Sequence, residues 1–312
     1  MPRKLFIIFL LGATLGAAAQ KLEPIAYGDF ENWITRNIKE SRIIGGKLHT
    51  CYAIGPEKTI EGSIPLTSTG DSPWATSNVM AKVVGITKVS NAIFPDKRGS
   101  GRCAKLTTRI EECKALGMIN IDVLVAGTMF LGKMLEPITS TSDPYTKMEM
   151  GIPFSSRPEA LVFDYKLEIP ANAQRIYSSG FGKKKERPGN DRAEVFVLLQ
   201  KRWEDSNGNL YAKRVGTARE LFGNNTATWV NKHSIKLKYG EEGKNSMNLI
   251  PEAKSYYARN SKGKLVPVKE VGWEDAQATP THMVLMFSSG SGEPYTGTPG
   301  LTFWVDNVAM AY

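Results

Sequence analysis

The chain has 312 residues, of which 41% are hydrophobic, and its formal net charge is +9, or +7 once Arg3 and Lys4 are removed. Its basic residues are dispersed, and the one dense run, residues 183–187, lies in a Gly/Pro-rich loop without interleaved aromatic residues. That pattern is typical of a solvated loop and disfavours nucleic acid as a partner. Three histidines and three cysteines without zinc-like spacing leave little transition-metal chemistry.

The N-terminus resembles an export signal. Arg3 and Lys4 precede an unbroken apolar run at residues 5–11, and Ala17, Ala18 and Ala19 supply the small residues expected before a cleavage site. The apolar run is shorter than the ~20 residues that a membrane span needs, although a retained anchor stays open as an alternative. No cysteine follows the run to carry a lipid. We therefore expect cleavage after Ala19 and a secreted protein in the periplasm or at the cell surface. It would be peripheral to the envelope, with no transmembrane segment after cleavage.

Strand-like segments punctuated by Gly, Pro, Asn and Asp follow one another along the remaining residues. They are residues 79–84, 104–109, 119–125, 161–169, 194–202, 234–239, 283–287 and 301–309. Residues 205–209 contain Asn-Gly at a predicted hairpin tip, and only residues 217–221 and 251–253 read as helical. Many short strands without intervening helices predict an all-β jelly-roll β-sandwich. Because no composition shift marks a boundary, we expect residues 20–312 to form a single domain, with residues 139–150 as a long connection.

Two local pairings are also predicted. Cys103 and Cys113 would close a short loop and are the most suitable disulfide pair, although spacing alone does not establish the bond. Asp164 and Lys166 share the outer side of one predicted strand, where an ion pair would account for both.

Five motifs together carry a family resemblance. They are GDFENW at residues 28–33, SPWATSN at 72–78, AGTMFLG at 126–132, GIPFSSRP at 151–158 leading into DYK at 164–166, and FSS at 287–289 through FWVDNV at 303–308. In this order they resemble the putative carbohydrate metabolism domain family of secreted proteins, over residues 29–312. The resemblance implies a jelly roll similar to galactose-binding-like and carbohydrate-binding-module sandwiches, in which the first and last strands pair.

In relatives with that sandwich, acidic residues near the first and last strands hold a structural calcium ion. Asp29, Glu31 and Asp306 are the matching residues here, and their oxygen atoms suit calcium. An alternative stays open in which Asp29 caps a turn and Asp306 bonds the backbone at a strand edge.

Sugar binding needs flat aromatic faces with polar groups nearby, and the chain has six tryptophans. Trp33 and Trp203 are expected in the core, and one of Phe303 and Trp304 should face inward. The candidates for glycan contact are therefore the three tryptophans in polar, turn-rich settings, together with one loop arginine: Trp74, Trp229, Trp273 and Arg157. Packing is the alternative for each tryptophan, and Arg157 would alternatively pin its loop through backbone carbonyls.

No catalytic motif accompanies these candidates. The carboxylates show no spacing that selects the pair needed for glycoside hydrolysis, and there is no Gly-x-Ser-x-Gly elbow. The sequence thus favours a non-catalytic glycan-binding domain that works in glycan capture or degradation. A glycoside hydrolase of unassigned mechanism and a structural or adhesive envelope component are the alternatives.

Overall fold

A computed structural model describes residues 20–83, 85–115, 119–140, 145–171, 174–180 and 182–312. The predicted signal peptide, residues 1–19, lies outside these described residues. Within them, no helix is long and apolar enough to cross a membrane.

Strands make up nearly all of the regular structure. In the first half of the chain they are β1 (Leu22–Pro24), β2 (Trp33–Lys39), β3 (Leu48–Ile54), β4 (Lys58–Glu61), β5 (Trp74–Thr76), β6 (Val79–Val83), β7 (Ile86–Ser90), β8 (Ile93–Arg98), β9 (Gly101–Thr107), β10 (Arg109–Ala115), β11 (Ile119–Val125), β12 (Thr128–Met134), β13 (Met148–Met150) and β14 (Ile152–Pro153). In the second half they are β15 (Ala160–Glu168), β16 (Ile176–Tyr177), β17 (Ser179–Gly180), β18 (Lys185–Glu186), β19 (Ala193–Glu204), β20 (Leu210–Phe222), β21 (Val230–Lys236), β22 (Lys238–Tyr239), β23 (Tyr257–Arg259), β24 (Leu265–Trp273), β25 (His282–Ser288), β26 (Thr296–Gly297) and β27 (Thr302–Ala311). Short 3₁₀ turns stand at η1 (Arg42–Ile44), η2 (Tyr145–Lys147), η3 (Gly240–Asn245) and η4 (Glu252–Lys254).

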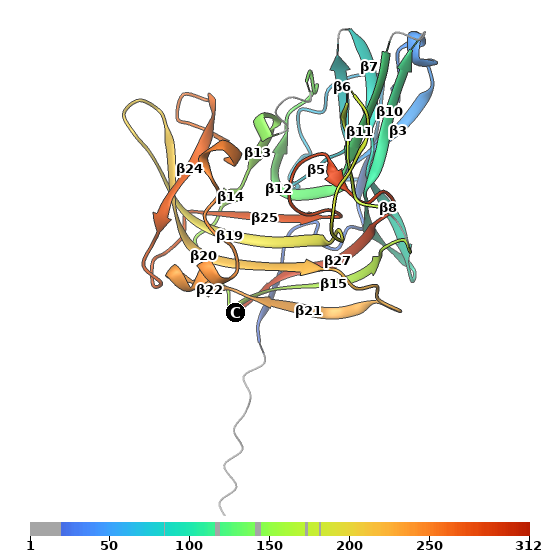
Figure 1. The fold of residues 1–312 in the computed structure, drawn as a ribbon. Helices are drawn as coiled ribbons and strands as arrows, with labels where there is room; N and C mark the ends of the chain where they lie inside the picture. Colours follow the sequence, from blue (N-terminus) through green and yellow to red (C-terminus); the bar gives the residue numbers. More distant parts are fainter. Residues whose placement is uncertain (1–19, 84, 116–118, 141–144, 172–173, 181) are drawn as a thin grey trace, which may run out of the picture.

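Two sheets form the body of the molecule. One has the order β21-β15-β27-β9-β8, with β1 added on β27. The other has the order β14-β25-β19-β20-β24-β23-β13-β12-β5. Because β12 also pairs with β25, strands near the two ends of this order lie side by side. In Figure 1 the long strands of both sheets run across the lower half, while β6, β7, β10 and β11 rise on the right and β24 rises on the left.

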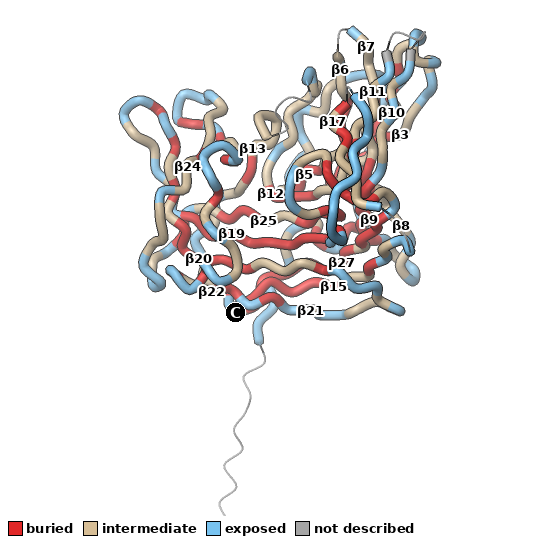
Figure 2. Tube along the Cα trace, in the orientation of Figure 1, coloured by how far each residue is buried: buried red, intermediate tan, exposed pale blue. Residues whose placement is uncertain are grey.

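The main core lies between the two sheets, as a β-sandwich requires. Along β15 the inward positions are Leu161, Phe163 and Leu167, and all three are fully buried. The facing positions of β19 are Val195, Val197 and Leu199, which are also fully buried. Figure 2 shows this buried layer running along the crossing strands, whereas the rising strands are mainly intermediate or exposed.

The all-β sandwich is as predicted, and each predicted strand overlaps an observed one. The hairpin at residues 205–209 is confirmed, since β19 and β20 pair antiparallel across it. Residues 217–221 are not helical, because they continue β20 along its pairing with β19. The first strand that pairs with β27 is β1, whereas residues 29–31 form a turn and coil.

Two predicted pairings are wrong. Cys51, Cys103 and Cys113 are all free thiols, and the two residues of the expected disulfide lie in different sheets, on β9 and β10. Asp164 pairs with Arg98, while Lys166 pairs with Glu168 at 2.6 Å.

Candidate functional site

A cleft of about 890 Å³ opens on the face of the ten-stranded sheet that points away from the main core. Its floor comes from β19, β20, β25 and Thr128 at the start of β12, and one wall comes from β6, β7, β10 and β11. Residues 247–256, with side chains from β12, β13 and η2, form the other wall. The volume lies in the range of small-molecule and cofactor sites.

The floor carries a polar row next to an apolar row. In strand register, Glu194 on β19 stands opposite Ser288 on β25, and Ser288 stands opposite Thr128 on β12. Two residues further along, Phe196 stands opposite Met286. Because side chains two apart on a strand share a face, both rows face the cleft. The floor is therefore amphipathic.

Hydrogen bonds fix the polar row. Arg219 on β20 donates its Nε–H to Glu194 Oε1 at 2.7 Å, and the hydroxyls of Thr128 and Ser288 are 3.0 Å apart. Glu194 is buried at the base of the cleft, which makes its carboxylate a pre-oriented acceptor.

Aromatic rings cover the apolar row. Tyr256 stacks on Phe196 with ring centroids 6.2 Å apart and an interplanar angle of 21°. Tyr145 meets Tyr256 edge-on at 5.9 Å, and all three rings line the cleft. Burial raises the pKa of Tyr256, so its hydroxyl stays protonated and can donate as well as accept.

A buried ion pair supports each wall. Beneath residues 247–256, Arg214 and Glu270 pair through two contacts, and Glu270 Oε2 also accepts the N–H of Ile250 at 2.7 Å. Under the strand wall, Glu136 accepts two hydrogen bonds from Arg36, at 2.7 and 2.8 Å. The same carboxylate accepts the N–H of Met80 on β6 at 3.0 Å.

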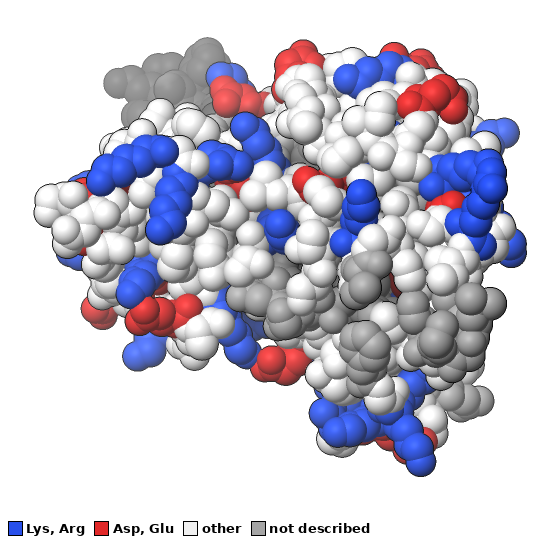
Figure 3. Space-filling view, turned by 90° about the horizontal axis from the view of Figure 1, so that it is seen from above, with Lys and Arg blue, Asp and Glu red and all other residues white. Residues whose placement is uncertain are grey.

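Two further carboxylates line the cleft. Glu111 Oε1 lies 3.3 Å from Arg109 Nε and accepts the N–H of Asn91 at 3.2 Å. Glu293 pairs with Lys254 at 2.5 Å at the rim. Seen from above, charged side chains are most numerous toward the margin of the molecule, and a few lie among the uncharged residues nearer its middle (Figure 3).

Trp74, one predicted contact residue, is fully buried. Its indole Nε1–H donates to the carbonyl of Ala26 at 2.9 Å, and its ring packs edge-on against Phe30 at 5.4 Å. The packing interpretation holds for this residue, because a buried ring offers no face to a sugar.

Trp229 and Trp273 are only partly exposed and lie outside the cleft lining. Arg98 sits over the Trp229 ring at 4.0 Å, and Arg214 lies 5.5 Å from the Trp273 ring centroid. Both rings therefore pack against an arginine of the protein itself. Trp203, expected in the core, is 42% exposed and stacks on Tyr211 where the hairpin extends past the core.

Arg157 bonds backbone carbonyls. It donates to the carbonyl oxygen atoms of Ala276 and Ala278 and lies 4.2 Å from the Tyr239 ring centroid. These contacts confirm that it pins a loop, which was the alternative to sugar contact.

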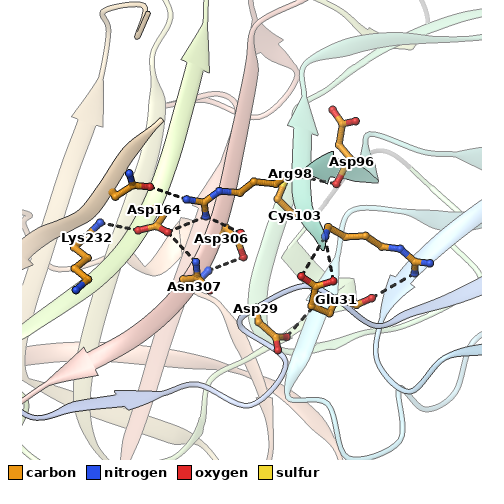
Figure 4. A network of polar contacts seen from close by, with 11 residues as sticks. Asp29, Glu31, Asp96, Arg98, Cys103, Asp164, Lys232, Asp306 and Asn307 are labelled. Carbon is orange, nitrogen blue, oxygen red and sulfur yellow. Dashed lines mark hydrogen bonds and ion pairs between the residues drawn. The ribbon is translucent and has the colours of Figure 1, made fainter. Parts of the chain in front are cut away.

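The three predicted calcium ligands do not converge on one point (Figure 4). Asp306 is paired with Arg98 at 2.6 Å, and Arg98 also contacts Asp164 at 2.8 Å, so one guanidinium already lies between these two carboxylates. Glu31 instead accepts the N–H of Arg102 at 3.1 Å, and Asp29 is exposed. No cluster of three or more possible metal ligands exists among the described residues. Calcium stays a prediction that this arrangement does not favour.

Sequence reasoning missed Tyr145, Tyr256 and Glu194. Alternation along β19 could have placed Glu194 and Phe196 on the face opposite Val195, and hence outside the core. Nothing local to Tyr145 or Tyr256 signals a site, because Tyr145 reaches the cleft from the short 3₁₀ turn η2 and Tyr256 from the irregular residues before β23.

Comparison with known proteins agrees with the motifs. The model of the putative carbohydrate metabolism domain family matches residues 29–311. A putative glycoside hydrolase from Bacteroides thetaiotaomicron VPI-5482 is 17% identical with a TM-score of 0.46, covering 86% of this chain and 81% of that one. Another from Bacteroides vulgatus ATCC 8482 is 15% identical with a TM-score of 0.41, covering 93% of this chain and 94% of that one. No curated protein matches. The chain belongs to the putative carbohydrate metabolism domain family.

Proposed function

We propose that the protein binds a carbohydrate, without cleaving it, in the cleft above β19 and β25. The observation that carries this proposal is the amphipathic floor, where the Glu194–Ser288–Thr128 row lies beside Met286 and Tyr256, and Tyr256 covers the buried ring of Phe196. A sugar ring has the same division, with polar hydroxyls at its edge and C–H groups on its faces. Hydroxyls would bond the polar row while a ring face packs on the aromatic cluster.

The carboxylates of the cleft fit recognition. Glu194 and Glu111 each already lie against an arginine, at 2.7 and 3.3 Å. Each is thus held as a hydrogen-bond acceptor, whereas a glycosidase needs one carboxyl group that donates a proton. Family membership supports the ligand class.

The test is affinity electrophoresis through gels that contain neutral and acidic polysaccharides, followed by binding constants for retained glycans. Tyr256→Ala and Ser288→Ala should each weaken retention at least tenfold, and circular dichroism should show both variants folded. Trp203→Ala, outside the cleft, should leave retention unchanged. Retention by no glycan, or loss in the Trp203 variant alone, would refute the proposal.

Hydrolysis is the second candidate, because Glu111 and Glu194 line the same cleft. Release of reducing ends from a retained glycan, abolished by Glu111→Gln and Glu194→Gln, would establish it. Binding without release supports recognition alone.

We also propose that binding takes place outside the cytoplasm, in the periplasm or at the cell surface. The basic residues and apolar run of the first nineteen positions support this location. N-terminal sequencing of the protein from a cell fraction should find Gln20 first, and an intact Met1 terminus would contradict it.

A further inference from the structure

The strand wall presents aliphatic side chains to open space. Ile121, Val123 and Val125 alternate along β11 and line the cleft, and all three are only half-buried. Val79, Ala81 and Val83 also alternate along β6 and line the cleft, where Val79 is buried and the other two are half-buried. Such rows normally face another layer of the protein, and apolar surface left uncovered marks an interaction site.

The opposite wall is apolar as well. Met134, Met148 and Met247 line it together with Leu249, and all four are half-buried. Methionine is flexible and polarisable, so such a wall adapts to apolar groups of different shape.

These walls do not match an unsubstituted sugar. Hydroxyls pressed against valine, isoleucine and methionine would lose water without gaining a hydrogen bond, which is costly. A purely aliphatic ligand does not match either, because it would strip water from Glu194, Arg219 and Glu111 without replacing it. The cleft as a whole therefore suits a ligand with one polar and one apolar part.

We propose that the cleft binds a saccharide that carries an apolar substituent, an acyl or alkyl chain. The sugar lies on the polar row of the floor, and the chain lies between the walls that contain Val123 and Met247. This inference rests on the proposed function for its sugar end and adds the aliphatic end.

The test compares three kinds of probe on the mature chain below the critical micelle concentration. They are methyl glycosides, n-octyl glycosides and 1-octanol, with the glycosides in gluco, galacto and manno forms. Binding is followed by calorimetry. For at least one sugar, the octyl glycoside should bind at least tenfold more tightly than both the methyl glycoside and 1-octanol.

Val123→Thr keeps the shape of the wall while adding a hydroxyl, and should reduce the octyl preference at least threefold. Val271→Thr, at an exposed position of β24, is the matched control and should leave the preference unchanged. Equal binding of methyl and octyl glycosides would overturn the inference and leave carbohydrate binding intact. Equal binding of octyl glycosides and 1-octanol would overturn the saccharide part, and with it the proposed function. Binding of none of the probes would overturn the inference.

Discussion

Glu270 on β24 and Arg214 on β20 form a buried ion pair whose carboxylate also accepts the N–H of Ile250 at 2.7 Å. Gln200 on β19 donates to the same carboxylate at 2.7 Å. The Glu270 side chain thus joins two strands of the floor to the segment that forms a wall of the cleft. The same carboxylate therefore stabilises both the sheet and the site.

Glu270→Gln should lower the free energy of unfolding by about 3–5 kcal/mol, because it leaves the Arg214 charge buried without a counterion. Urea denaturation measures the change. Glu168→Gln, which removes an exposed partner of Lys166, is the control and should cost less than about 1 kcal/mol. Equal losses in the two variants would show that the buried pair is not a support.

Replacing both Arg36 and Glu136 by methionine should lower the free energy of unfolding, although it leaves neither charge buried without its partner. Glu136 also accepts the backbone N–H groups of Leu66 and Met80, at 2.9 and 3.0 Å, and methionine leaves both unsatisfied. Each orphaned donor costs about 1–3 kcal/mol. The double variant should therefore stay at least about 2 kcal/mol below the wild type in urea. Recovery to wild-type stability would contradict this role for Glu136.

Trp74→Ala should lower the free energy of unfolding by about 3–5 kcal/mol, since it leaves a cavity in the core and frees the Ala26 carbonyl. Trp203→Ala should cost about 1 kcal/mol or less, because this ring is 42% exposed. A larger loss for Trp203→Ala than for Trp74→Ala would contradict the burial of Trp74 and the exposure of Trp203.

His282 should make the fold sensitive to acid. Burial, and then the charge of Arg202, lowers the pKa of His282 to about 4. In the unfolded chain its pKa is about 6.5, so between pH 6.5 and 4 the unfolded state binds a proton that the folded state rejects. Stability contributed by the neutral ring therefore falls as the pH falls through this window. Between pH 6.5 and 4.5, the melting temperature of His282→Gln should fall by less than that of the wild type. An equal or larger fall would exclude this histidine as the cause of the acid sensitivity.

The many short strand-like segments without intervening helices were sufficient to predict the sandwich. In the strand predicted at residues 161–169, Leu161, Phe163 and Leu167 lie on one face of β15 and are fully buried. Propensity failed at residues 217–221, where pairing between β19 and the thirteen-residue strand β20 outweighs the local helical preference.

The site was harder to predict, because it depends on which parts of a strand the second sheet covers. Trp203 lies on the same face of β19 as the buried residues Val195, Val197 and Leu199. At Trp203, however, the strand extends beyond the core. The rings that line the cleft, Tyr145 and Tyr256, come from segments whose positions are set by distant contacts such as Glu270 to Ile250. Neither fact can be read from local sequence.

The most direct test of carbohydrate binding in the cleft is a crystal structure with the most strongly retained glycan. A sugar ring should pack against Tyr256, with hydroxyls within hydrogen-bonding distance of Glu194 or Ser288. A glycan held at Trp203, Trp229 or Trp273 instead, with none bound between the two walls, would contradict the proposed site.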